Sequence, residues 1–138
     1  MMGYYITVTS CDVTITDPAR ALQAIKDMPP TGGGSHGFAW VSHAAVQSAR
    51  TLVEALREWR WTAVEHHGCV DIDYFFGEKH GDDLMMFTAI APFVNPGGYV
   101  EVLGEENETW RWFFDGAICH ELDARITWPP DPPLVGTV

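Results

Sequence analysis

Alternating apolar and polar positions from Tyr4 to Ser10 predict a half-buried strand near the start of the chain. Apolar residues at helical spacing then follow Asp17 and Pro18, an N-cap residue and a proline at the first helical position. We therefore expect a helix that begins at Pro18 and runs to Met28, where two further prolines end it.

In the middle of the chain, the spacing of apolar residues changes twice between that of a strand and that of a helix. A short apolar run at 38–41 predicts a strand, and helical spacing over about 45–60 predicts a longer helix capped by Ser42. Two further strands are expected at 61–66 and 69–76, joined by a tight turn.

A third helix is expected from Asp82 or Asp83 to about Phe93, because an acidic cap precedes the apolar run there. The stretch Asn95-Pro96-Gly97-Gly98 stops it. Three closing strands are predicted at 99–103, 109–114 and 117–127.

One register of the first closing hairpin sorts its side chains by polarity. If Leu103 pairs with Thr109, Glu101 faces Arg111 as a cross-strand ion pair on one face. The other face then holds Val100, Val102, Trp110, Trp112 and Phe114.

The next hairpin carries a strong turn signal at Asp115-Gly116. A two-residue turn there predicts that Trp112 pairs with Cys119 and that Arg111 pairs with His120.

These elements predict an α+β fold in a single domain over 1–128, followed by a loose proline-rich tail over 129–138. The expected architecture is a mainly antiparallel sheet with three helices on one side and a C-terminal β-meander.

Charge changes this picture more than composition does. The net charge is −11 over 138 residues, and residues 65–123 carry all of it, with thirteen acids against Lys79 and Arg111. Such a balance argues against direct binding to nucleic acid or to an anionic membrane, and it permits attraction to a basic protein surface. Solubility alone is the simpler explanation of the acidity.

Three unevenly spaced cysteines, and no predicted signal peptide or membrane span, favour a reducing compartment. We therefore expect a cytoplasmic protein.

A glycine-rich stretch, Gly32 to Gly37, spells the dinucleotide-binding pattern, but it follows a helix instead of a strand. It is better explained as a connector, or as the lid of a small enzyme or small-ligand-binding protein. Such a site would use His36, His43, His66 or Asp71 beneath the lid. Candidates for a covalent nucleophile are Ser10, Cys11, Ser35, Ser42 and Cys69, although no catalytic motif supports any of them.

A metal-binding module is the second alternative. Its ligands would come from His66, His67 and Cys69 together with the run Cys119-His120-Glu121. Neighbouring residues on a strand point to opposite faces and no paired cysteines occur, so we predict neither a metal site nor a cofactor.

The stretch from Tyr99 to Phe114, the run Ala89-Ile-Ala-Pro-Phe-Val and the start Met2-Gly-Tyr-Tyr-Ile-Thr resemble small uncharacterised acidic proteins of phages and actinobacteria. The resemblance implies a phage or mobile-element setting, where short acidic proteins block nucleic-acid machinery or defence enzymes. Immunity proteins against basic nucleases use the same charge complementarity.

The leading hypothesis is a non-enzymatic inhibitor or adaptor that imitates nucleic-acid charge and docks a basic surface on another protein. Aromatic side chains among the acids would supply the buried contacts. The predicted binding residues are Asp71, Asp73, Tyr74, Asp82, Asp83, Tyr99, Glu101, Glu105, Glu106, Glu108 and Phe113.

Overall fold

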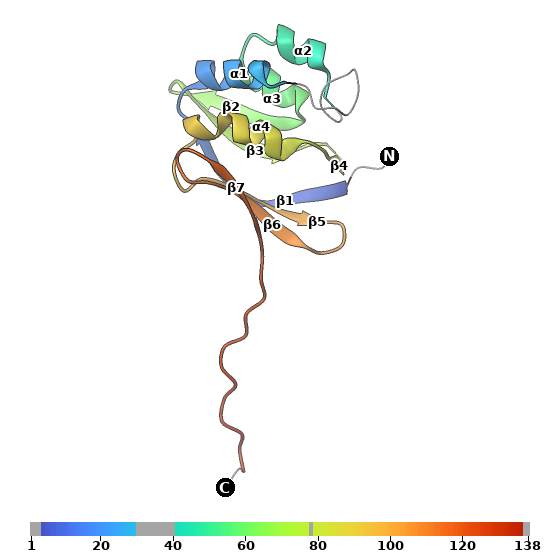
Figure 1. Ribbon diagram of the computed structural model, residues 1–138, viewed down its shortest axis with the longest axis vertical. Helices are drawn as coiled ribbons and strands as arrows, with labels where there is room; N and C mark the ends of the chain where they lie inside the picture. The colour runs from blue at the N-terminus through green and yellow to red at the C-terminus, as the bar shows by residue number, and fades with distance from the viewer. Residues whose placement is uncertain (1–3, 30–40, 78, 137–138) are drawn as a thin grey trace.

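The computed structural model describes residues 4–29, 41–77 and 79–136, and Figure 1 shows how they are arranged. Within these residues, seven strands form one sheet in the order β2-β3-β1-β5-β6-β7, with the short β4 beside β1. All the described strand pairs are antiparallel. The strands are β1 (Tyr4–Ile15), β2 (Trp61–His66), β3 (Cys69–Phe75), β4 (Lys79–His80), β5 (Tyr99–Gly104), β6 (Thr109–Phe114) and β7 (Cys119–Asp123).

In the part of the chain that the structure describes, four α-helices and one short 3-10 helix lie on one side of this sheet (Figure 1). The α+β class and the sheet with helices on one side are therefore confirmed, with four α-helices in place of the expected three. They are α1 (Pro18–Asp27), α2 (His43–Ser48), α3 (Leu52–Glu58), α4 (Asp83–Ile90) and η1 (Ala91–Phe93).

The additional helix comes from a break in the predicted helix over 45–60. Ala49 is extended, and Thr51 starts a new helix by accepting a hydrogen bond from the backbone N–H of Glu54 at 3.2 Å. The Glu54 carboxylate accepts from the backbone N–H of Arg50 at 2.9 Å, so both residues of the Thr-x-x-Glu pattern cap α3. This pattern is visible in the sequence and marks the boundary.

Strand lengths also differ from the prediction. β1 continues to Ile15 and is the central strand, paired with β3, β4 and β5. β7 ends at Asp123, short of the predicted 127. The strand expected at 38–41 falls largely outside the described residues.

The register predicted for the first closing hairpin is confirmed: Leu103 pairs with Thr109, and Glu101 pairs with Arg111. The second register is wrong by two residues, because Phe114, not Trp112, is the partner of Cys119. Asp115 causes the difference by accepting hydrogen bonds from the backbone N–H groups of Ala117 and Ile118, at 2.9 and 2.8 Å. The loop is therefore longer than two residues.

An aromatic cluster fixes α4 on the middle of the sheet. The ring of Phe87 lies 5.1 Å from Trp61, 5.0 Å from Trp112 and 5.8 Å from Phe114, centroid to centroid. All four side chains are fully buried. Close aromatic packing of this kind stabilises the helix against the strands.

Candidate protein-binding face

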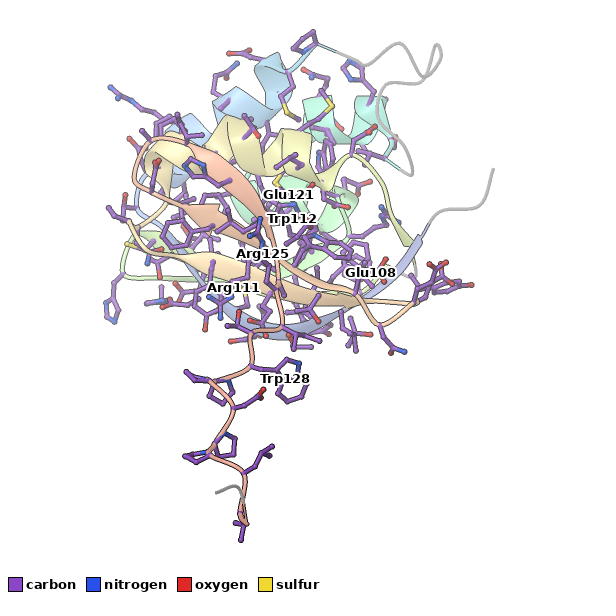
Figure 2. All side chains as sticks on the ribbon, turned by 60° about the horizontal axis from the view of Figure 1, so that its bottom comes forward. Glu108, Arg111, Trp112, Glu121, Arg125 and Trp128 are labelled. Carbon is purple, nitrogen blue, oxygen red and sulfur yellow. The ribbon has the colours of Figure 1, made fainter. Side chains whose placement is uncertain are left out.

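The side of the sheet that faces away from the helices is uncovered by any described helix. Figure 2 turns this side toward the viewer and labels Arg111 on it. Side chains alternate along β5 and β6, so that buried residues face the helices and the others face solvent. We call the outward set the open face; it includes Ser10, Asp12, Thr14, Asp71, Tyr99, Glu101, Arg111 and Phe113.

Glu101 and Arg111 form the centre of the open face. The Arg111 Nε donates to Glu101 Oε1 at 2.8 Å, and the Thr9 hydroxyl donates to Glu101 Oε2 at 2.9 Å. The hydrogen bond from Arg111, followed by that from Thr9, lowers the pKa of the Glu101 carboxyl. The predicted cross-strand ion pair is therefore present.

Tyr99 and Phe113 are neighbours across the same hairpin. The Arg111 guanidinium carbon lies 4.9 Å from the centroid of the Tyr99 ring, a cation–π arrangement. The Tyr99 and Ser10 hydroxyls are 2.8 Å apart and hydrogen-bond each other. Both aromatic side chains are half-buried, so part of each ring meets solvent.

Asp71 extends the acidic character of the open face to β3. Its carboxylate accepts a hydrogen bond from the Thr14 hydroxyl at 2.6 Å and pairs with the His66 Nε2. The Thr14 hydrogen bond first, and then His66, lower the pKa of Asp71. Because these partners lie on β1 and β2, the carboxylate links three strands.

Three glutamates occupy the turn between β5 and β6, at one end of the open face. The backbone N–H of Tyr5 donates to Glu105 Oε1 at 3.3 Å, and the N–H of Glu106 donates to Glu108 Oε1 at 3.1 Å. All three glutamates are exposed, and Figure 2 labels Glu108 at the end of the hairpin. With Glu101, the stretch 99–114 carries four acids against Arg111 alone, a net charge of −3.

Two predicted residues lie elsewhere in the fold. Asp82 precedes α4 on the helix side, and Asp83 is buried with no exposed surface. Asp83 accepts from the Trp61 Nε1 and from the Gly81 N–H, both at 3.0 Å, so it cannot contact a partner. The prediction that Asp83 is a surface acid is wrong, because its carboxylate accepts hydrogen bonds from N–H groups that would otherwise lack an acceptor inside the protein.

Asp73 and Tyr74 are exposed, but they sit at an irregularity in β3. In a regular strand, Phe75 would lie on the same face as Asp71. The structure buries Phe75 on the opposite face, because the register shifts between Trp61 and Ala63 of the partner strand. Tyr74 is 51% exposed and lies beside this irregularity.

Sequence reasoning missed Asp12 and Thr14 of the open face, because it ended the first strand at Ser10. The signal was present: Cys11, Val13 and Ile15 are apolar, and polar residues stand between them. Extending the strand to Ile15 on that alternation would have placed Asp12 and Thr14 on its polar face, and the structure pairs Asp12 with Tyr99.

The described members of the set proposed for a lidded site do not lie together. His43 begins α2 on the helix side, whereas His66 and Asp71 meet on the open face. Ser35, His36 and the stretch Gly32 to Gly37 lie outside the described residues.

No group of three potential metal ligands occurs in residues 4–29, 41–77 and 79–136. Cys119 is buried against the core, while His120 pairs with Asp115 at 2.7 Å on the surface. Burial raises the pKa of the Cys119 thiol to about 12, and does the same for Cys11. Neither thiol is therefore an activated nucleophile.

A shallow hollow of about 280 Å³ opens where β6, β7 and the following segment meet. Glu101, Arg111 and Leu122 line it together with Asp123 and Arg125. Figure 2 labels Arg111 and Arg125 at this place. The hollow makes a shallow depression at the edge of the open face. Its lining carries both acidic and basic side chains, so it favours neither a cation nor an anion.

Within the described residues, no helix is long and apolar enough to cross a membrane. Comparison of the chain with protein-family models, curated proteins and solved structures found no match.

Proposed function

We propose that this protein is a binding module whose open face docks a basic surface on another protein, as an inhibitor or adaptor. One observation carries the proposal: the helices cover a single side of the sheet, and the other side presents half-buried aromatic rings among carboxylates. A face of this kind offers anchors for buried contacts and a charge that accelerates association with a basic partner.

The acidic turn and the aromatic pair have different tasks in this proposal. The carboxylates of Glu105, Glu106 and Glu108 project at the end of the hairpin, where they attract a cationic surface during approach. Tyr99 and Phe113 lie further along the same hairpin and supply apolar contact area after docking. Imitation of nucleic-acid charge and a phage-type setting are the narrower form of the proposal, which rests on charge and on the sequence resemblance.

The test starts with affinity capture from a bacterial lysate, after which the captured protein is purified and its affinity is measured at low and moderate salt. A triple variant, Glu105→Gln with Glu106→Gln and Glu108→Gln, removes three charges from the turn. A matched control, Asp27→Asn with Glu58→Gln and Asp131→Asn, removes three charges from α1, α3 and the tail.

We expect a basic partner whose affinity falls about tenfold or more in the turn variant, mainly through slower association, and hardly changes in the control. A second variant, Tyr99→Ala with Phe113→Ala, should speed dissociation instead. Equal losses in the turn variant and the control, or an affinity insensitive to salt, would count against the proposal.

A further inference from the structure

The segment that contains β7 has an apolar–polar alternation whose apolar side chains are not buried in this chain. From Leu122 to Trp128, apolar and polar residues alternate, as in a half-buried strand. The apolar set is Leu122, Ala124, Ile126 and Trp128, and the polar set is Asp123, Arg125 and Thr127. Yet Leu122 is 48% exposed, Ile126 87% and Trp128 81%.

β7 is an edge strand, and the chain runs on past the strand it pairs with. The last ladder bond joins the Ala124 N–H to the Thr109 carbonyl at 3.0 Å, and β6 begins at Thr109. Residues 125–128 therefore have no neighbour among the described strands of the sheet, and Figure 1 shows this segment leaving the domain. The pattern fits a strand whose partner is a second molecule.

Backbone directions restrict how a partner strand can join. Because the Ala124 N–H points to β6, the backbone groups of Asp123 and Arg125 point to the free edge, as successive residues alternate in an antiparallel ladder. If two copies pair this edge antiparallel, each edge-directed residue must face another edge-directed residue, and each residue that points to β6 must face another of that kind. Two facing residues therefore both have odd numbers or both have even numbers.

Charge selects one of these registers. Centring the pair on Asp123 places the two Asp123 side chains opposite each other, and centring it on Arg125 does the same for two arginines. Centring it on Ala124 places Asp123 opposite Arg125 twice. Opposite charges across strands stabilise a pair, and like charges destabilise it.

The same register also matches the apolar residues. Leu122 faces Ile126 in both halves, the two Ala124 residues meet on the axis, and His120 faces Trp128. The strand ends naturally after Trp128, because Pro129 has no N–H to donate to the ladder.

We propose that two copies of this chain dimerise by antiparallel pairing of residues 120–128 about a twofold axis through Ala124. Such an axis runs perpendicular to the sheet, since side chains keep to their own face. The helices of both copies then lie on one side, and the two open faces join on the other. The proposal does not depend on the function proposed above.

The test exchanges the charges of Asp123 and Arg125 and measures molar mass by light scattering and analytical ultracentrifugation. The unmodified chain should have twice the 15.4 kDa of one copy. Asp123→Arg alone opposes arginine to arginine, and Arg125→Asp alone opposes aspartate to aspartate, so each variant should be monomeric. The double variant, Asp123→Arg with Arg125→Asp, restores both pairs and should again be dimeric.

A mixture of the two single variants gives the sharpest result. One chain then carries two arginines and the other two aspartates, so the mixture should form a one-to-one dimer although neither variant dimerises alone. Asp131→Arg, which changes the net charge as Asp123→Arg does but lies beyond the pairing, should remain dimeric. All three positions, 123, 125 and 131, are exposed, and circular dichroism checks that each variant is folded.

A monomeric parent chain would overturn the proposal. A dimeric Asp123→Arg variant, or a mixture of the two single variants that stays monomeric, would equally overturn the register centred on Ala124.

Discussion

The indole N–H of Trp61 donates to the carboxylate of Asp83 at 3.0 Å, in a place where neither side chain meets solvent. This bond joins the first residue of β2 to the first residue of α4. Arg60 lies close enough for Asp83 to raise the pKa of its guanidinium against the larger, lowering effect of burial. Asp83, a fully buried acid of the acidic segment, therefore stabilises the fold.

Replacing Asp83 with Ala should destabilise the domain by roughly 3 kcal/mol, because the Trp61 N–H and the Gly81 N–H would both lose their acceptor. The free energy of unfolding in urea measures the effect. Asp82→Asn, one residue earlier and partly exposed, should change it by no more than about 0.5 kcal/mol. Similar losses in the two variants would show that Asp83 has no special role.

Short-range patterns made much of the fold predictable. The register of the hairpin from Tyr99 to Phe114 agrees with one alternation of large apolar and charged residues, because pairing Leu103 with Thr109 puts both tryptophans in the core and Glu101 opposite Arg111. The turn at His67-Gly68 follows similarly, with φ values of 50° and 78° that suit a tight hairpin.

Long-range satisfaction of polar groups was not predictable in this way. Nothing local to Asp83 indicates that the indole of Trp61, 22 residues away, will bind it. The irregularity in β3 and the longer loop at Asp115 also depend on individual contacts, which the alternation of apolar and polar residues does not reveal. The acidic segment therefore divides into a buried acid and surface acids only once the fold is known.

Asp115 should make stability depend on pH in the acid range. Hydrogen bonds from His120 first, and then from the N–H groups of Ile118 and Ala117, lower its pKa from 3.8 to about 2. A lowered carboxyl pKa stabilises the fold above its unfolded value, so this contribution is complete above about pH 4 and disappears as the pH falls toward 2.

Urea denaturation of the parent and of Asp115→Asn between these pH values tests this expectation. The parent should be more stable at the upper end, and the difference should narrow as the pH falls. A difference that stays constant with pH would mean that the Asp115 carboxylate is not held by these donors.

The Glu101–Arg111 pair should contribute little to stability despite its central place. The Arg111 side chain is 51% exposed and that of Glu101 26%, and exposed ion pairs are worth at most about 1 kcal/mol. We expect Glu101→Gln to lower the free energy of unfolding by no more than that amount. Thermal and urea denaturation at low and high salt measure it, and a larger loss would mean that the pair supports the sheet itself.

The three cysteines should differ in their reaction with an alkylating reagent. Burial raises the pKa of Cys11 and of Cys119 to about 12, so at pH 8 only a small fraction of either thiol is the reactive thiolate. Cys69, partly exposed beside the turn of the β2–β3 hairpin, should react first, and the other two should react at its rate only after denaturation. Timed alkylation followed by peptide mass spectrometry measures each rate in one experiment. Rapid labelling of Cys119 in the folded protein would place β7 away from the core and would contradict the hairpin register described above.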